Sequence, residues 1–163
     1  MSAALKVVRP GLFDTVQDFG RVGFMALGMP TAGAMDRIAL SLANALVGNP
    51  LGTAGIEIGV MGPDLLVEAD SVRIALVGPL SASLIEGPDA APKPLDSDRS
   101  HLLKRGQVLK VGMVAGSSTA YLAIAGGLAL PVFMGSLSTY SRAGVGGFEG
   151  RKLAAGDMLP LAK

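Results

Sequence analysis

The chain has 163 residues, half of them hydrophobic and 17% charged, with a net charge of +1 and a mean hydropathy of +0.50. This length fits one domain with a single core, and this composition excludes intrinsic disorder. Basic and acidic residues are interspersed, which excludes the concentrated positive charge that attracts nucleic acids. No apolar run reaches the ~20 residues of a membrane-spanning helix, so we expect neither a nucleic-acid nor a membrane partner.

Cysteine is absent, which excludes disulfide bonds and thiolate chemistry and fits a reducing compartment. The first residues, MSAALKVVRPG, lack the apolar segment of a signal peptide. We therefore expect a cytoplasmic protein. Because few charged residues are available to cover its surface, we also expect a partner to cover some apolar surface.

The first predicted element is a strand at residues 5–8, and an irregular segment at residues 17–36 follows it. Its sequence, QDFGRVGFMALGMPTAGAMD, fits neither the helical nor the strand period. Gln17 and Asp18 offer hydrogen-bond acceptors, and Arg21 offers a planar fork suited to carboxylate or phosphate. Irregular apolar segments must be held by packing and often line binding sites. The alternative is that Asp18 and Arg21 form an ion pair that only pins the loop.

One helix is predicted at residues 37–47. Asp36 precedes it as a good N-cap, a role that we favour for this residue over one in a site, and Gly48 and Pro50 end it. The apolar side chains spread over an arc of roughly 200°, which predicts a helix that covers the open end of a barrel. These side chains are Ile38, Ala39, Leu40, Leu42, Ala43, Leu46 and Val47, and the remaining side holds Arg37, Ser41 and Asn44.

Six further strands are predicted after the helix, several with the alternation of a half-buried strand. They lie at residues 56–60, 65–69, 72–77, 81–86, 108–111 and 120–125. Gly-Pro pairs at 62–63, 78–79 and 87–88 mark the breaks. Many short strands with regular breaks favour a sandwich or a closed barrel, so we predict a mainly β fold with one helix. Residues 87–100, rich in proline and charge, are expected to form an exposed excursion between two strands.

A second candidate site segment lies at residues 139–153, with the sequence TYSRAGVGGFEGRKL. The backbone N–H groups of so glycine-rich a loop can form a concave anion nest, which the two arginines would reinforce. The segment lacks the Gly-Lys-[Ser/Thr] of a Walker A loop and the strand-turn-helix context of a Rossmann fingerprint. The alternative is a mobile surface loop.

Some absences narrow the chemistry further. The only histidine, His101, has no second ligand at metal spacing, so we predict a hydrogen-bonded histidine at a strand edge and no metal site. No Gly-x-Ser-x-Gly elbow occurs, which argues against a serine hydrolase triad. No biotinyl-lysine motif occurs either, so any biotin would be carried by another chain.

Three long stretches resemble one known family. They are GLFDTVQDFGRVGFMALGMPTAGAMDRIALSLANALVGNP, EIGVMGPDLL and YLAIAGGLALPVFMGSLSTYSRAGVGGFEGRKLAAGD. They are similar to the family called allophanate hydrolase subunit 2, or biotin-dependent carboxyltransferase-like, and the likeness runs from about Val8 to Leu161. That family includes the C subunit of bacterial ATP-dependent 5-oxoprolinase, the KipA antagonist protein and part of the carboxyltransferase domain of urea carboxylase.

The resemblance implies a cyclophilin-like closed β-barrel with one capping α-helix at about residues 37–47. It implies that residues 1–163 form a single barrel domain, the first half of a longer family chain. The implied partners are a KipI-like B subunit and, in 5-oxoprolinase, an A subunit, with a small amide or lactam as substrate. The implied cofactor is ATP with Mg²⁺ in the complex, and biotin on a separate carrier only under a carboxylase reading.

Family patterns fall on residues 15–21, 33–36, 43–49 and 140–151, and we infer the roles of their members from chemistry. The candidate catalytic residues are Asp18, Arg21 and Glu149. The candidate substrate-binding or phosphate-binding residues are Gln17, Gly20, Gly33, Met35, Asp36, Tyr140, Arg142, Gly146, Gly147, Gly150 and Arg151. Segments 17–36 and 139–153 would then form facing walls of one site.

The leading functional hypothesis is that the chain is part of an enzyme that converts 5-oxoproline to glutamate with ATP. Activating the amide oxygen as a phosphate needs donors for anionic oxygens, for which Arg21, Arg142 and Arg151 are candidates, and a carboxylate that manages a proton, for which Asp18 and Glu149 are candidates. One alternative is carboxyl transfer to urea or another amide. Another is a non-catalytic KipA-like regulator that binds a KipI-like inhibitor of a sensor kinase.

Overall fold

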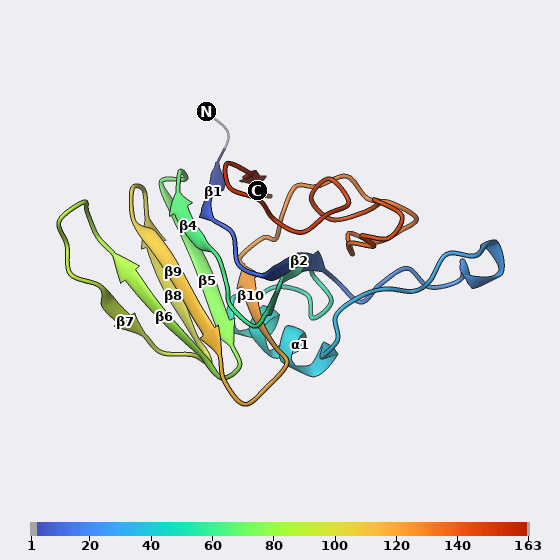
Figure 1. The fold of residues 1–163 in the computed structure, drawn as a ribbon, viewed down its shortest axis with the longest axis horizontal. Coiled ribbons are helices and arrows are strands. Elements are labelled where there is room, and N and C mark those ends of the chain that lie inside the picture. The colour runs from blue at the N-terminus through green and yellow to red at the C-terminus, as the bar shows by residue number, and fades with distance from the viewer. Residues whose placement is uncertain (1–2, 163) are drawn as a thin grey trace.

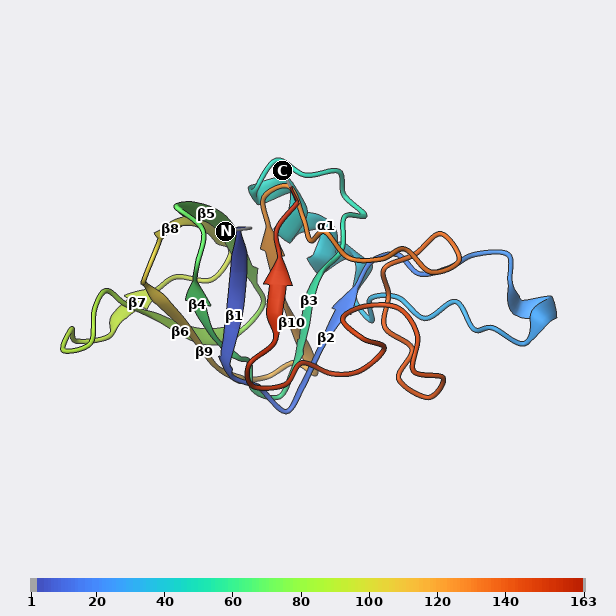
Figure 2. The same ribbon diagram turned by 90° about the horizontal axis from the view of Figure 1, so that it is seen from above.

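The computed structural model describes residues 3–162 as two antiparallel β-sheets with one α-helix (Figures 1 and 2). The six-stranded sheet has the order β11 (Met158–Pro160), β1 (Ala4–Arg9), β4 (Asp64–Val67), β9 (Val108–Val114), β6 (Leu80–Ile85), β7 (Lys93–Leu95). The five-stranded sheet has the order β2 (Phe13–Gln17), β3 (Gly55–Gly59), β10 (Thr119–Ile124), β5 (Ser71–Val77), β8 (Arg99–Lys104). The mainly β fold and all seven predicted strands are confirmed. The strand pairing forms two separate sheets, so closure into a barrel is not confirmed.

The main hydrophobic core lies between the two sheets. On β10, Ala120, Leu122 and Ile124 belong to this core, whereas Tyr121 and Ala123 point to the opposite face and pack beneath the helix. The strand is therefore buried on both faces, which explains why its sequence is a nearly continuous apolar run.

The helix α1 (Arg37–Leu46) packs on β10 and β5, on the outer face of the five-stranded sheet rather than at an open end of a barrel. Its predicted N-cap is confirmed, because the Asp36 carboxylate accepts hydrogen bonds from two N–H groups of the first turn (3.0 and 2.9 Å). The predicted buried face is only partly right. Leu40 and Ala43 are buried, and Ala39, Leu46 and Val47 are partly buried against the sheet. Ile38, however, is 83% exposed, and Asn44, predicted on the polar side, is buried.

The burial of Asn44 is explained by its hydrogen bonds. Its amide nitrogen donates to the carbonyls of Leu51 (3.2 Å) and Thr53 (2.7 Å), and its oxygen accepts from Asn49 (3.0 Å). Asn49 in turn donates to the Ile124 carbonyl at the end of β10 (2.8 Å). A polar side chain whose hydrogen bonds are all made by tertiary contacts can occupy the buried face, and local periodicity cannot reveal this.

Four strands were not predicted from the sequence: β2, β7, β8 and β11. The excursion expected at residues 87–100 contains β7 and the first residues of β8, so it is a hairpin arm rather than an irregular connection. His101 lies on β8, an edge strand, and its Nε2 atom is 2.8 Å from the Asp96 carbonyl, as expected of a hydrogen-bonded histidine at a strand edge.

The outer edge of β2 is covered by a long irregular stretch between β10 and β11. The Thr139 N–H donates to the Val16 carbonyl (2.9 Å), and the Leu153 N–H donates to the Asp14 carbonyl (2.9 Å). Both views place this stretch beside the base of an arm that projects from the body of the molecule (Figures 1 and 2). The arm is formed by residues 20–33, with the short 3-10 helix η1 (Met25–Leu27) at its tip. Residues 3–162 contain no helix long and apolar enough to cross a bilayer.

Candidate functional site

The Asp18 carboxylate ties the end of β2 to residues 136–138. Its oxygens accept hydrogen bonds from the hydroxyls of Ser136 and Ser138 (both 2.6 Å) and from the backbone N–H groups of Leu137 (2.6 Å) and Gly20 (2.7 Å). Burial alone would raise the pKa of Asp18, but these four donors outweigh burial and hold the pKa below its ordinary value. Asp18 is thus a fixed anion that positions the loop.

The Arg21 side chain is buried beside the same loop. It is 1% exposed, and its Nη2 atom donates to the Ser138 carbonyl. Its guanidinium carbon lies 5.6 Å from the centroid of the Phe133 ring. None of the ion pairs within residues 3–162 involves Arg21. The alternative, an ion pair between Asp18 and Arg21, is therefore wrong. The Nε and Nη1 atoms have no hydrogen-bond partner.

Gln17 holds the neighbouring peptide. Its amide nitrogen donates to the Thr15 hydroxyl (3.0 Å) and to the Thr139 carbonyl (3.3 Å), while its buried Oε1 atom has no partner. The head groups of Gln17 and Arg21 are therefore attached to successive carbonyls of one segment, residues 138–139. One offers a free acceptor, and the other offers free donors.

Unpartnered polar atoms are confined to one short stretch of the chain. Within residues 3–162, the buried side-chain nitrogen and oxygen atoms without a partner are Asp14 Oδ1, Gln17 Oε1, Arg21 Nε and Arg21 Nη1. All lie within residues 14–21. Because a buried polar group without a hydrogen bond costs about 1–3 kcal/mol, this concentration makes residues 14–21 the candidate site.

Asp14 is a candidate functional residue that was not predicted from the sequence. Burial raises its pKa to about 7, against the opposing effects of the Gly11 N–H (2.7 Å) and of the Arg9 and Lys152 charges. The available signal was an acid between the two hydrophobic residues of FDTVQ, because a buried acid within a strand is unusual.

The glycine loop of residues 139–153 packs against the cluster formed by Gln17, Asp18 and Arg21 (the Arg21 cluster), as predicted. Two of its glycines are needed for this close packing rather than for anion binding. A Cβ atom at Gly146 would lie 2.7 Å from Arg21 Nη2, and one at Gly147 would overlap the Thr139 hydroxyl. These two glycines let the backbone pack directly on the cluster. Three of the four glycine N–H groups expected to form an anion nest, those of Gly144, Gly147 and Gly150, already donate to backbone carbonyls.

Three predicted charged residues of this loop either pair with one another and with Asp157 or are exposed. Arg151 pairs with Asp157 through both terminal nitrogens (2.8 and 2.9 Å) and with Glu149 (2.7 Å). Arg142 is exposed. None of these side chains is hydrogen-bonded to Gln17, Asp18 or Arg21 within the described part of the chain. The predicted roles of Glu149, Arg142 and Arg151 therefore gain no geometric support.

Other predicted residues lie at the base of the arm or directly after it. Gly33, at φ +94°, packs against the backbone of Gly20, and together they form the narrow base of the arm. The backbone N–H of Met35 donates to Glu57 (2.7 Å), and that of Asp36 donates to the Tyr121 hydroxyl (2.8 Å). Burial, together with Glu57, raises the pKa of that hydroxyl.

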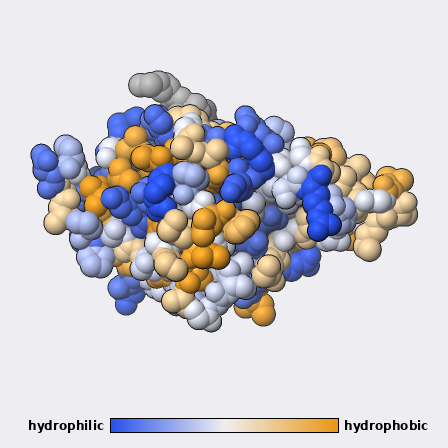
Figure 3. Space-filling model, viewed as in Figure 1, coloured by the Kyte–Doolittle hydropathy of each residue, from blue (hydrophilic) through white to orange (hydrophobic). Residues whose placement is uncertain are grey.

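The middle of the arm does not form a wall of the cluster. Val22, Met25 and Leu27 are each more than 70% exposed, and the end of the arm is largely hydrophobic (Figure 3). Packing is expected to hold this apolar segment, but the two backbone hydrogen bonds at its base, from Arg21 N–H to the Thr31 carbonyl and from Ala34 N–H to the Asp18 carbonyl (both 2.8 Å), join its two sides to each other. The Arg21 side chain joins this base to the Ser138 carbonyl. Tyr140 and residues around the tip, including Met25 and Met29, line a shallow pocket.

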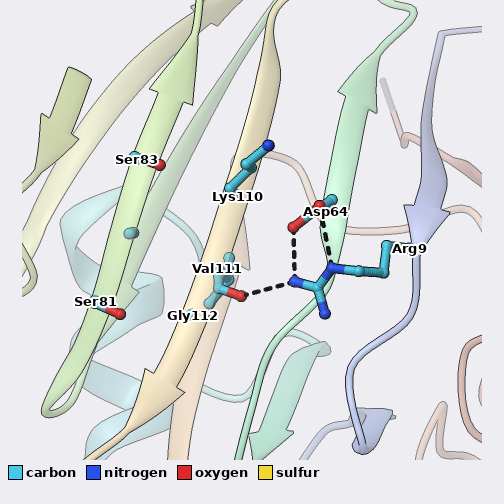
Figure 4. Close-up of a pocket in the computed structure, with 8 residues that line it drawn as sticks. Arg9, Asp64, Ser81, Ser83, Lys110, Val111 and Gly112 are labelled. Atoms are coloured by element: carbon cyan, nitrogen blue, oxygen red, sulfur yellow. Dashed lines mark hydrogen bonds and ion pairs between the residues drawn. The ribbon is translucent and has the colours of Figure 1, made fainter. Parts of the chain in front are cut away.

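A polar pocket of about 380 Å³ lies elsewhere, on the outer face of the six-stranded sheet (Figure 4). Arg9 enters it from β1 and forms a two-pronged ion pair with Asp64 (2.8 and 3.1 Å), while Lys110 lines the adjacent wall. Because Arg9 is fully occupied by Asp64 and by nearby carbonyls, this pocket lacks the free donors of the Arg21 cluster.

No three His, Cys, Asp or Glu side chains of residues 3–162 gather as metal ligands would. The Arg21 cluster can instead bind an anion: a buried guanidinium supplies unpaired N–H donors, and Gln17 Oε1 can accept a hydrogen bond from an N–H group of the same ligand.

Comparison with known proteins identifies relatives of this chain. The family model described as carboxyltransferase domain, subdomain A and B, matches residues 27–163. The chain is 37% identical to urea amidolyase of Lachancea kluyveri over 97% of its own length and 8% of the relative. It is 37% identical to the C subunit of 5-oxoprolinase from Escherichia coli over 98% of its length and 49% of the relative.

The fold has the same relatives. The crystal structure of Kluyveromyces lactis urea carboxylase matches with a TM-score of 0.90 and 37% identity, covering 98% of this chain and 14% of that one. The chain thus spans about half the length of the 5-oxoprolinase relative and a small part of the urea enzymes. With its matching model and shared fold, the chain belongs to the carboxyltransferase domain family, subdomain A and B.

Proposed function

We propose that this chain forms part of the substrate site of an ATP-dependent 5-oxoprolinase, in which it acts with a KipI-like B subunit and an A subunit. The observation that carries this proposal is the buried Arg21 guanidinium, which retains unpaired Nε and Nη1 atoms. A relative of similar sequence, the C subunit of 5-oxoprolinase, is named as one part of such an enzyme and is matched along nearly the whole of this chain.

In this proposal Arg21 binds an anionic oxygen of the substrate or of its phosphorylated form, and Gln17 Oε1 accepts the lactam N–H. Preorganised donors of this kind act where negative charge develops, since they need no rearrangement during the reaction. Asp18 has a positioning role: its four hydrogen bonds hold residues 136–138 and thereby the carbonyl to which Arg21 is attached.

Proton transfer is assigned to another part of the complex. The Asp18 carboxylate is occupied and has a lowered pKa, and Glu149 is paired with Arg151. The glycine loop is also a poor cradle for the phosphates of ATP, because three of its four glycine N–H groups already donate to backbone carbonyls.

Carboxyl transfer to urea or a related amide is a second candidate. It is favoured by the equal identity, 37%, to urea amidolyase and by the TM-score of 0.90 to urea carboxylase. In this reading the Arg21 donors would bind the oxygens of the transferred carboxyl group, with biotin carried by a separate domain or chain.

The test is 5-oxoproline-dependent release of phosphate from ATP, using the natural protein that carries this chain together with its A and B subunits. We expect turnover in the wild type and at least a 100-fold loss in Arg21→Lys, because lysine keeps the charge but loses the planar fork. Arg37→Lys is the matched control, since Arg37 also lies over a phenylalanine ring, 5.5 Å from the Phe19 centroid, but on an exposed surface.

An assembled complex that releases no phosphate in response to 5-oxoproline would refute this proposal. ATP consumption that depends on urea, bicarbonate and a biotinylated carrier would then support carboxyl transfer. Tight binding to a KipI-like protein without turnover under either condition would support the regulatory alternative.

A further inference from the structure

Within residues 3–162, three of the four sheet edges are protected. The edge strand β11 is covered by residues 127–129, where the Ala129 N–H donates to the Pro160 carbonyl (2.9 Å). The edge strand β2 is covered by the irregular stretch that precedes β11. The edge strand β7 has only three residues, and one of them, Pro94, has no N–H group. Proteins protect sheet edges in these ways because unpaired backbone groups bind other strands.

The fourth edge, β8, is open. This strand has six residues without glycine or proline, and in the described part of the chain it pairs only with β5. A pocket of about 460 Å³ opens beside it, and its lining includes the apolar side chains of Leu84, Leu95 and Leu102. The strands β8 and β2 are opposite edges of the five-stranded sheet, and Figure 2 shows them on different sides of the molecule. A partner bound at β8 therefore leaves the Arg21 cluster free and is independent of the proposed function.

The hydrogen bonds of β8 show which of its backbone groups are used. In an antiparallel pair, every second residue exchanges backbone hydrogen bonds with the strand opposite, and the residues between turn their N–H and C=O groups the other way. The Arg105 N–H donates to the Asp70 carbonyl (3.2 Å) at the end of the β5–β8 register. Counted back in steps of two, the residues of β8 that bond to β5 are Leu103, His101 and Arg99.

Two of the residues between them keep free backbone groups at the open edge. Lys104 is not one of these, because its N–H donates to the Gln107 side chain (2.7 Å) and its carbonyl accepts from the Gln107 N–H (3.1 Å). Ser100 and Leu102 have no such partner among residues 3–162. Their free groups lie symmetrically on either side of His101.

We infer that β8 pairs antiparallel with β8 of a second copy of this chain, about a two-fold axis at His101. Ser100 then lies opposite Leu102 of the second copy, and each of the two equivalent pairs exchanges two backbone hydrogen bonds. Lys104 lies opposite Asp98 of the second copy, and both are exposed, so unlike charges meet at both ends of the pairing. The free groups and the charges of β8 thus complement those of an identical strand, which makes a second copy the occupant of this edge.

Neighbouring registers use backbone groups that are already bonded. An axis at Leu102 would require the backbone of Lys104, which Gln107 occupies. An axis at Ser100 would require the backbone of Asp98, whose N–H donates to the Leu76 carbonyl (2.7 Å). The register centred on His101 is therefore the one that the free groups permit.

The first experiment measures the dissociation constant of the dimer by analytical ultracentrifugation of the natural protein that carries this chain. Leu102→Pro removes a free N–H group at the edge and leaves the bonds to β5 intact. Because the two-fold axis doubles this loss, we expect the dimer to weaken at least about 10-fold. Leu102→Thr keeps the N–H group and is the matched control, with an expected change of less than about threefold.

The second experiment tests the register by disulfide cross-linking, which is possible because the chain has no cysteine of its own. In the proposed dimer the two His101 residues face each other as a non-hydrogen-bonded pair, with Cα atoms about 4.5 Å apart, which suits a disulfide. We therefore expect His101→Cys to form a covalent dimer under mild oxidation. Arg99→Cys is the control on the same strand: its two copies would lie about 13 Å apart and should not cross-link.

A protein that stays monomeric at every concentration would overturn the inference, as would a dimer that Leu102→Pro leaves unchanged. Cross-linking of Arg99→Cys in place of His101→Cys would overturn the pairing about His101. The two cysteine variants keep the test decisive if Leu102→Pro does not fold. Slow hydrogen exchange of the Ser100 and Leu102 amides in a monomeric protein would show that another segment covers this edge, and would equally overturn the inference.

Discussion

Residues 14–21 and residues 151–157 both carry buried or half-buried polar side chains, but the two segments differ in whether these side chains have hydrogen-bond partners. In the second segment, the Asp157 carboxylate accepts hydrogen bonds from both terminal nitrogens of Arg151 and from the Ala154 N–H (2.8 Å). Arg151 also donates a hydrogen bond to Glu149. In the first, the Asp18 carboxylate is fully hydrogen-bonded, but Asp14, Gln17 and Arg21 all keep unpartnered atoms.

The difference separates structural from functional polar groups. Mutual pairing, as between Arg151 and Asp157, costs little and fixes a turn, whereas a buried guanidinium without an anion lowers stability. A fold retains such a group only when something else is gained, and a ligand that supplies the missing anion is the simplest gain. Substitutions in the two segments test this contrast, beginning with the largest expected effect.

Asp18→Ala should cost about 4–5 kcal/mol of unfolding free energy, because four donors lose one ionised acceptor. Denaturant unfolding measures this loss. Asp70→Ala is the control: Asp70 is exposed and pairs only with Arg105, so its removal should cost less than about 1 kcal/mol. A loss below about 1 kcal/mol for Asp18→Ala would show that the 136–138 loop is not held by this carboxylate.

Asp14 should make the protein less stable as the pH rises. Its pKa is about 7 when folded against an ordinary 3.8, so the folded chain binds the proton more tightly. The stabilising contribution is complete below about pH 4 and disappears as the pH rises to about 7, a change of at most about 4 kcal/mol.

Asp14→Asn should remove this dependence, because asparagine imitates the neutral acid. The measurement compares the unfolding free energies of wild type and variant between about pH 4 and pH 8, and parallel curves would contradict the assignment. Asp18 has a lowered pKa, so Asp18→Asn provides a control of opposite sign: the contribution of that carboxylate is lost as the pH falls.

Asp157→Asn should cost about 1–2 kcal/mol of unfolding free energy, since it weakens a two-pronged pair in which Arg151 is partly exposed. Turnover of 5-oxoproline by the complex should change less than twofold. A loss of activity above 10-fold, in a variant that remains folded and assembled, would place Arg151 in the substrate site after all.

The sequence sufficed for the parts of the fold that depend on local patterns. Alternation and Gly-Pro breaks located seven strands, and Asp36 with Gly48 located the helix. The strand β2 could not be predicted from the sequence because the buried Asp14 interrupts the apolar pattern. The strand β8 could not be predicted because this edge strand, RSHLLK, is largely polar. The burial of Asn44 on α1 was missed because its hydrogen-bond partners are contributed by residues beyond the helix.

The candidate site was only partly predictable for the same reason. The residue types indicated Gln17, Asp18 and Arg21 as candidate site residues and placed them near the glycine loop. It did not distinguish Arg21, which is buried without an anion, from Arg151, which is paired with Asp157 six residues away. That distinction depends on tertiary burial and on the geometry of a turn, and a list of charged residues contains neither.

The most direct test of the central claim, that Arg21 is retained for a ligand rather than for stability, is Arg21→Met measured in two ways. We predict an unfolding free energy within about 1 kcal/mol of wild type or above it, because removal of a poorly paired buried charge offsets the lost bond to Ser138. We predict at the same time a loss of at least 100-fold in kcat/KM for 5-oxoproline in the assembled complex. A variant that loses about 3 kcal/mol or more of stability and yet keeps its activity would contradict the account.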